Sequence, residues 1–351
     1  MRRYGRLQRL ALAAGAAASL ALPGAAAAEP AGSLRASASL GGDSNPRRVY
    51  GPGEPDVVAS VLLDAAGKLS AGPVDLSAGY AAAGRKFFAL FSEDTLAQGA
   101  EAELSVRPLG SVQLAVNGRV KDRRGGSRRY SDLQSAAALR WRAVPELEVE
   151  LHGGAHRFID WAVFEYSYSS PEAGARVRFR FDRHHALSVG GDLGHRKYNA
   201  LAQMETTQPD PPEIIREDGV LSAAASYSYR GPFQLSVSYQ YFDAASNSYG
   251  ETLSFHRVEL TLGAPLPWEL LVFAQLALQL GRYPDGVFLS PNLPPLREDD
   301  ERHNSLVFKL ARPLGERLDL ELRYGVWVNV LSKNELFYFR QAGSIGLTFR
   351  L

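Results

Sequence analysis

The sequence predicts an all-β fold: a transmembrane antiparallel up-and-down β-barrel of about sixteen strands, with short periplasmic turns and long extracellular loops. Three observations support this prediction. Runs that alternate between apolar and polar residues repeat along the chain, Gly or Pro marks short turns between paired runs, and the last run ends at the final residue, Leu351. Because successive strand side chains point to opposite faces, each run has one apolar and one polar face.

The N-terminus has the pattern of a secretory signal peptide. Four arginines and no acid occupy residues 1–9, an apolar run covers 10–22, and three small residues at 26–28 offer a cleavage site. We therefore expect residues 1–28 to be a cleaved signal peptide and residues 29–351 to form a single barrel domain. The chain contains no cysteine, which excludes a lipoprotein anchor and disulfide bonds.

Charge and hydropathy exclude two further classes of protein. Without residues 1–28 the chain keeps 35 basic and 38 acidic residues, a net charge of −3. This charge argues against nucleic acid as a partner. Beyond the leader there is no apolar stretch of about 18 residues, so a bundle of transmembrane helices is excluded as well.

Seven short turns divide the alternating runs into pairs, and eight longer polar connections join those pairs. An even number of strands, about sixteen within a range of roughly 14 to 18, places both termini in the periplasm. A soluble β-sandwich also alternates, but the leader, the terminal strand and the asymmetry of the connections favour a membrane barrel. The short turns lie at 71–73, 108–110, 144–145, 182–185, 231–232, 264–267 and 313–315, and the longer connections lie near 42–55, 83–94, 122–131, 158–171, 195–218, 243–251, 282–304 and 330–337.

The last strand carries a terminal pattern of four residues. Ser344 is followed two positions later by Gly346, and the apolar residues Phe349 and Leu351 end the chain. This pattern resembles the C-terminal assembly signal of bacterial outer-membrane β-barrels, with Leu351 in place of the usual Phe. The resemblance implies the outer membrane of a Gram-negative bacterium, insertion by the barrel-assembly machinery, and contact with outer-membrane lipid and lipopolysaccharide. We expect this strand to pair with the first strand over residues 34–40.

A second, shorter motif ends the first predicted strand. Asp43-Ser44-Asn45 is typical of an Asx turn, in which an aspartate side chain accepts a backbone N–H two residues on. A similar element ends the first strand of the barrel domains of the surface-lipoprotein assembly modifiers, which this short segment resembles. The helical repeat domain that precedes those barrels has no counterpart in this sequence.

Alternation also predicts which charged residues face the lumen. If the apolar residues of 147–151 face lipid, Glu148 and its acidic neighbours face inward, between two strands whose inward residues are basic. Matching the faces across the turns pairs Arg140 with Glu148. The same rule pairs Arg142 with Glu146 and Arg176 with Asp192.

Arg119, Lys121, Arg178 and Arg180 have no acid opposite them in this register, so we expect them to favour anionic solutes. Alternatively, the lumenal charges only stabilise the wall as ion pairs. The predicted lumen-lining residues are Arg119, Lys121, Arg140, Arg142, Glu146, Glu148, Glu150, Arg176, Arg178, Arg180, Asp192, Arg257, Glu259, Asp319, Glu321 and Arg323.

Aromatic residues lie near the ends of the predicted strands, where membrane barrels carry interfacial belts. Trp141 and Trp268 adjoin short turns, whereas the aromatic residues that adjoin long connections are Phe158, Trp161, Tyr166, Tyr168, Phe337, Tyr338 and Phe339. We expect these residues to form belts at the two boundaries between lipid and water.

A barrel of about sixteen strands leaves a channel, whereas one of about eight strands is filled by its own side chains. The predicted function is therefore an outer-membrane pore, either a porin-like diffusion channel or the outer-membrane conduit of an export system. The alternative is a non-conducting scaffold that holds envelope partners in a machine for polysaccharide export, motility or secretion. No histidine stands in a recognisable catalytic frame or metal-ligand spacing, so the sequence predicts no enzyme, metal or cofactor.

Overall fold

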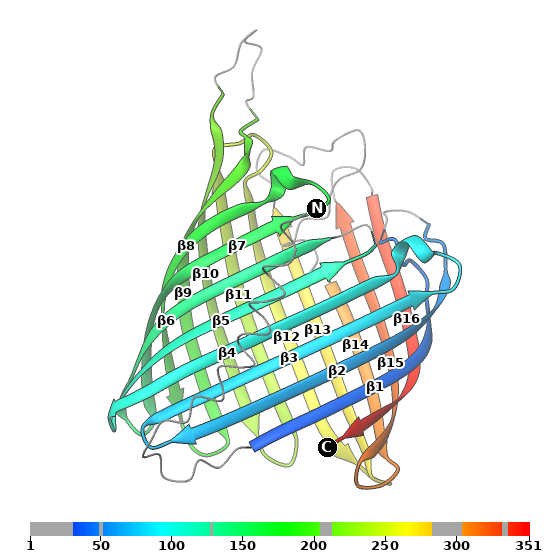
Figure 1. The fold of residues 1–351 in the computed structure, drawn as a ribbon, viewed down its shortest axis with the longest axis horizontal. Coiled ribbons are helices and arrows are strands. Elements are labelled where there is room, and N and C mark those ends of the chain that lie inside the picture. Colours follow the sequence, from blue (N-terminus) through cyan, green and yellow to red (C-terminus); the bar gives the residue numbers. More distant parts are fainter. Residues whose placement is uncertain (1–30, 49–51, 127–128, 204–212, 283–303, 332–335) are drawn as a thin grey trace, which may run out of the picture.

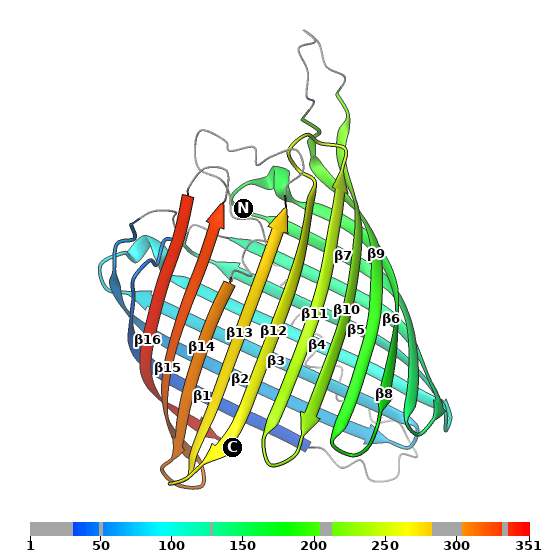
Figure 2. The same ribbon diagram turned by 180° about the vertical axis from the view of Figure 1, so that it is seen from behind.

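The computed structural model describes residues 31–48, 52–126, 129–203, 213–282, 304–331 and 336–351, so the predicted signal peptide at 1–28 lies outside the described residues. Sixteen antiparallel strands follow one another around a closed barrel, in which the last strand pairs with the first (Figures 1 and 2). The predicted fold class is confirmed. The strands are β1 (Ala31–Asp43), β2 (Asp56–Ala71), β3 (Val74–Phe87), β4 (Thr95–Leu109), β5 (Val112–Arg124), β6 (Tyr130–Val144), β7 (Leu147–Asp160), β8 (Tyr168–Arg180), β9 (His185–Leu201), β10 (Ile215–Arg230), β11 (Gln234–Ser246), β12 (Leu253–Leu266), β13 (Leu270–Arg282), β14 (Asn304–Pro313), β15 (Leu318–Leu331) and β16 (Leu336–Arg350).

The two ends of the barrel differ in their connections. The turns at one end have two to four residues, and the described chain both begins and ends there (Figure 1). In the β8–β9 turn, the Asp182 carboxylate accepts the backbone N–H of His184 (2.6 Å) and of His185 (2.8 Å), which lowers the pKa of Asp182. The connections at the other end are longer and include the short 3-10 helices η2 (Phe91–Glu93) and η3 (Phe164–Tyr166).

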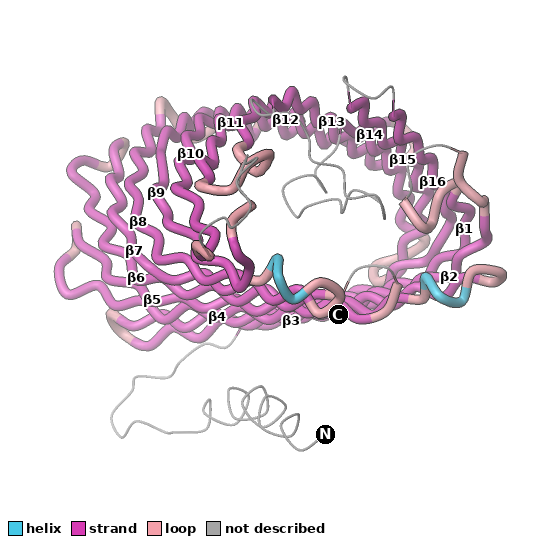
Figure 3. Tube along the Cα trace, turned by 90° about the horizontal axis from the view of Figure 1, so that it is seen from above, coloured by secondary structure: helices cyan, strands magenta, loops and turns pink. Residues whose placement is uncertain are grey.

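The outer face of the barrel is apolar. Val61, Leu114 and Leu193 leave half or more of their surface exposed, as side chains that face lipid do. Seen from above, the ring of strands is elongated rather than circular (Figure 3). No helix among the described residues is long and apolar enough to span a membrane.

The apolar core is confined to small clusters on the inner face. One cluster contains Tyr130, Phe158, Tyr168 and Tyr198, in which neighbouring rings lie 5.2 to 5.6 Å apart. The prediction of a lipid-facing belt was therefore wrong for Phe158 and Tyr168, and also for Tyr338, which is buried too. Each of these residues is separated from the inward-facing charges of its own strand by an even number of positions. Because successive strand side chains alternate between faces, these residues point into the lumen and away from lipid. Trp141 and Trp268 are exposed beside their turns.

Strands β1 and β16 close the barrel along a seam that small residues line. The two strands pair over the predicted residues 34–40, with Ala36 opposite Phe349. A Cβ added at Gly41 would lie 2.0 Å from the carbonyl oxygen of Gly343, and one at Gly346 would lie 2.5 Å from that of Ala38. Only glycine allows the two backbones to approach this closely.

A buried ion pair fastens the loop end of the seam. The guanidinium of Arg340 donates from Nε to both carboxylate oxygens of Asp43, at 2.9 and 3.0 Å, and packs over the ring of Trp327. The same carboxylate accepts the backbone N–H of Asn45 at 3.1 Å. The Asx turn predicted at Asp43-Ser44-Asn45 is therefore confirmed, and it also serves to anchor β16.

Two of the predicted strand registers were wrong by two residues. Arg140 lies opposite Glu150, and Arg142 lies opposite Glu148, because the β6–β7 turn consists of Pro145 and Glu146 and the register shifts beside it. Glu146 therefore lies in the turn and not on the strand.

Across the β8–β9 turn, Arg176 lies opposite Gly190 and not Asp192. The physical reason is that four residues, 181–184, form that turn, and their number fixes the register of the hairpin.

Candidate functional site in the barrel lumen

The register places the predicted lumenal charges on one continuous face of the sheet. Arg140 borders a cavity of about 610 Å³ and therefore faces the lumen. Residues that lie opposite one another on adjacent strands share a face, so the cross-strand partners of Arg140 identify the inner face of each neighbouring strand. Every residue of the predicted set that belongs to a strand falls on this inner face, from Arg119 on β5 to Arg323 on β15. The strand register thus defines where each of these side chains lies on the wall.

Arg140 is the centre of an ion-pair cluster on β4, β6, β7 and β8. Its guanidinium donates to both carboxylate oxygens of Glu103, at 2.9 and 3.0 Å, and its Nε donates to Glu150 at 2.7 Å. Arg176 lies 3.7 Å from Glu150, and Arg142 lies 3.5 Å from Glu148. A two-pronged contact of this kind fixes the planar guanidinium in one orientation.

Two histidines lie on the same wall and contact different acids. Nε2 of His152 lies 2.7 Å from Asp192, and Nε2 of His156 lies 2.9 Å from Asp132. Among the described residues, no group of three or more such side chains is arranged to hold a metal ion.

A second set of ion pairs crosses the seam near the turn end. Glu321 on β15 accepts a hydrogen bond from Arg35 on β1 at 2.8 Å and lies 2.7 Å from the ammonium of Lys309 on β14. Beside it, Asp319 pairs with Arg350. Arg257 on β12 pairs with Glu259 on the same strand.

The charges that remain without a partner are mostly basic. Among inward-facing residues of the described strands, four carboxylates have neither an ion pair nor a histidine partner, namely Asp56, Asp64, Glu101 and Asp160. Asp56 and Asp160 accept backbone N–H groups instead. The excess of cations follows from the pairing, because most lumenal carboxylates are already held by a neighbour. The inward-facing cations without an ion pair are Arg85, Arg119, Lys121, Arg178, Arg180, Arg230 and Arg323, of which Lys121 packs over the ring of Tyr130. The prediction that no acid lies opposite Arg119, Lys121 and Arg178 was wrong, because the actual strand registers place Glu101, Asp132 and Glu148 at those positions.

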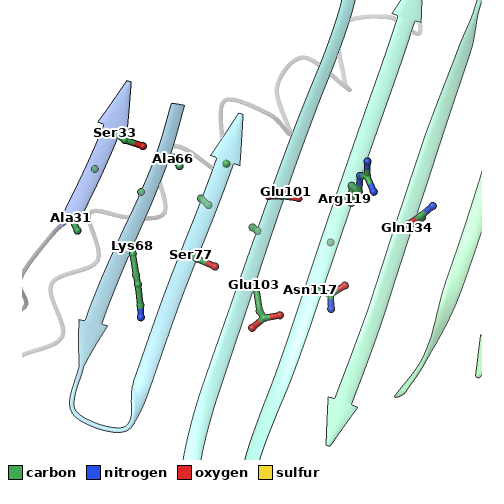
Figure 4. Close-up of a pocket in the computed structure, with 16 residues that line it drawn as sticks. Ala31, Ser33, Ala66, Lys68, Ser77, Glu101, Glu103, Asn117, Arg119 and Gln134 are labelled. Carbon is green, nitrogen blue, oxygen red and sulfur yellow. The ribbon is translucent and has the colours of Figure 1, made fainter. Parts of the chain in front are cut away.

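Two cavities follow the inner wall on either side of the Glu103–Arg140 ion pair. The first, of about 720 Å³, extends from β1 to β6 and includes Glu101, Glu103 and Arg119 in its wall (Figure 4). The second, of about 610 Å³, extends from β5 to β10 and includes Arg140, Arg178 and Arg180. The ion pair therefore separates a cavity lined by two acids and two bases from one lined by four arginines and three acids.

Comparison with known proteins identifies the architecture. No protein-family model and no curated protein matches the sequence. Among solved structures, an anion-selective porin from Comamonas acidovorans superposes with a TM-score of 0.52 at 11% identity, over 93% of this chain and 100% of that chain. The fold is that of the outer-membrane porins. At this identity the likeness concerns the fold alone.

Two other solved structures superpose less well. Pseudomonas aeruginosa OccD3 has a TM-score of 0.44 at 10% identity, over 92% of this chain and 91% of that chain. A bacterial polysaccharide outer membrane secretin has a TM-score of 0.43 at 10% identity, over 91% and 98% of the two chains.

Several charged residues of this porin-fold lumen were not predicted. Glu103 is the two-pronged partner of Arg140, and Lys309 and Arg35 hold Glu321. Arg85 is an exposed, inward-facing cation near the loop end of β3. Their parity within each strand could have identified them. Their contacts could not be read from sequence, because Glu103 and Arg140 lie on strands that are not adjacent.

Proposed function

We propose that this protein is an outer-membrane diffusion pore whose lumen favours small anions. The single observation that supports the proposal is the imbalance of partners on the inner wall. Seven cations without an ion pair, against four carboxylates, leave a positive field in the described part of the lumen. In a narrow water-filled passage, fixed charges of one sign favour ions of the opposite sign.

The same proposal covers the setting of the pore in the envelope. A leader at 1–28 would direct export, the terminal strand would be read by the barrel-assembly machinery, and lipopolysaccharide would surround the apolar outer face. Both termini would then lie in the periplasm, at the end that carries the short turns. The proposal includes no catalytic step, cofactor or metal.

Reversal potentials in a salt gradient test the proposal. The purified protein in planar bilayers is expected to conduct and to prefer chloride over potassium. The double substitution Arg178→Glu and Arg180→Glu should move the reversal potential toward cation preference, and the shift should shrink at high salt, because screening shortens the reach of fixed charges.

The control is Arg124→Glu. Arg124 is the last residue of β5, at the loop end of the barrel, and its exposed side chain pairs with Asp122. The substitution changes one charge at the loop end without altering the lumenal wall, so the reversal potential should stay close to its original value. If the open channel keeps its ion selectivity after the double substitution, a role for Arg178 and Arg180 in selectivity is refuted. A silent barrel would refute the pore and favour the non-conducting scaffold.

A further inference from the structure

The first cavity holds an acid and a base that face each other without forming an ion pair. Glu101 on β4 and Arg119 on β5 are direct cross-strand partners. Both side chains are exposed to the lumen, and neither has an ion pair with any described residue. Opposite charges at such positions ordinarily attract each other, so their separation needs a cause.

The cause lies on the strand at the other side of Glu101. Its partner on β3 is Gly79, and a Cβ added there would lie 3.2 Å from Cγ and 3.3 Å from Oε1 of Glu101. The glutamate side chain therefore occupies the space that a missing side chain leaves on β3. Because β3 and β5 flank β4 on opposite sides, this position draws the carboxylate away from Arg119.

The rest of the cavity wall leaves these two charges available to a solute. The other charged residues in the wall are already engaged, Glu103 with Arg140 and Lys68 with Asp75. The remaining lining side chains are small or uncharged and polar, such as Asn117 and Ser77 (Figure 4). No aromatic side chain lines this cavity, so the wall offers no stacking surface for a flat ring.

We infer that this cavity binds small zwitterions, with the solute carboxylate at Arg119 and the solute ammonium at Glu101. The inference rests on the proposed pore function and adds a solute class to it. A simple anion gains from Arg119 but is repelled by Glu101. A zwitterion such as an amino acid satisfies both charges at once and brings no net charge into the lumen.

Liposome swelling with two isomeric solutes tests the inference. β-Alanine and lactamide have the same formula and no net charge, but only β-alanine carries separate positive and negative groups. Proteoliposomes that contain the intact barrel should admit β-alanine faster than lactamide. Since exposed ion pairs are weak, the ratio of the two swelling rates should fall about two- to fivefold in Glu101→Gln and in Arg119→Gln.

Gly79→Ala is the sharpest variant, because it changes no charge. Its methyl group should push Glu101 toward Arg119, so that the two side chains pair with each other and the ratio falls as in the charge variants. The matched control is Asp64→Asn, which neutralises another inward carboxylate without an ion pair, on β2 outside this cavity. Its ratio should equal that of the unsubstituted protein.

The outcomes separate the inference from the proposed function. Heat-modifiable migration on gels confirms that each variant has folded. Suppose that the unsubstituted barrel conducts chloride, but that Glu101→Gln, Arg119→Gln and Gly79→Ala all leave the ratio of the β-alanine and lactamide swelling rates unchanged. The zwitterion site is then wrong, and the proposed pore function is retained. If Glu101→Gln lowers the ratio but Gly79→Ala does not, the separation by Gly79 is refuted. Absence of both conductance and swelling would overturn the pore itself.

Discussion

At the scale of single residues, the lumen of this barrel is organised by which charges find a partner. Arg140 makes three hydrogen bonds to two acids on the inner wall, whereas Arg178 and Arg180, two and four positions beyond Arg176 on β8, have no ion pair with a described residue. Residues of the same type on the same wall therefore serve different purposes. The engaged guanidinium stabilises the wall, and the free ones are available to solutes.

A double-mutant cycle tests the register around Arg140. Arg140→Gln and Glu150→Gln should show a coupling energy of about 1 kcal/mol in the free energy of unfolding, since the pair is only partly exposed and hydrogen-bonded. Arg140→Gln and Glu148→Gln serve as the control and should be additive, because Glu148 pairs with Arg142 instead. Urea unfolding followed by tryptophan fluorescence gives the energies. Coupling to Glu148 in place of Glu150 would contradict the observed register.

At the scale of elements, the seam between β1 and β16 combines close backbones with one buried ion pair. The side chains of Asp43 and Arg340 are 2% and 8% exposed, so removing one partner leaves the other as a nearly buried, unpaired charge. The Asx turn ties this pair to the entry of the first long loop. The seam thus depends on a residue contact at the loop end and on glycines along its length.

Asp43→Asn should lower the free energy of unfolding by about 3 kcal/mol, because it leaves the Arg340 charge without its partner. The double variant Asp43→Asn with Arg340→Leu should lose less, since no unpaired charge then remains. The measurement is the urea concentration at which the folded band disappears on unheated gels. A double variant less stable than Asp43→Asn alone would contradict the ion-pair explanation.

At the scale of the whole molecule, closure of the ring is what makes sixteen strands a pore. The backbone N–H of Leu34 donates to the carbonyl oxygen of Leu351 at 3.0 Å, and the reverse bond measures 2.8 Å, so the final residue completes the ladder at the turn end. A closed ladder leaves no unpaired edge in lipid.

Deletion of residues 349–351 should therefore abolish insertion, because it removes the last cross-strand contacts with β1 and the terminal pattern together. The full chain should migrate as a compact band on gels until it is boiled, whereas the truncated chain should migrate only as the unfolded form. Phe349→Leu is the conservative control and should insert. Normal insertion of the truncated chain would contradict a role for the terminal residues in assembly.

The sequence alone determined the strand number, the faces and the closing pair of strands. These features depend on periodicity of two, on turn residues and on the alternation in β1 and β16, all of which are local. Only the tertiary structure decided which charges meet. The β6–β7 register depends on how the chain turns at Pro145 and Glu146, and the contact of Glu103 with Arg140 spans the intervening strand β5. The separation of Glu101 from Arg119 likewise depends on Gly79, because the glycine leaves space on β3 for the Glu101 side chain. These three residues are distant in sequence, and only the folded barrel brings them into one cavity.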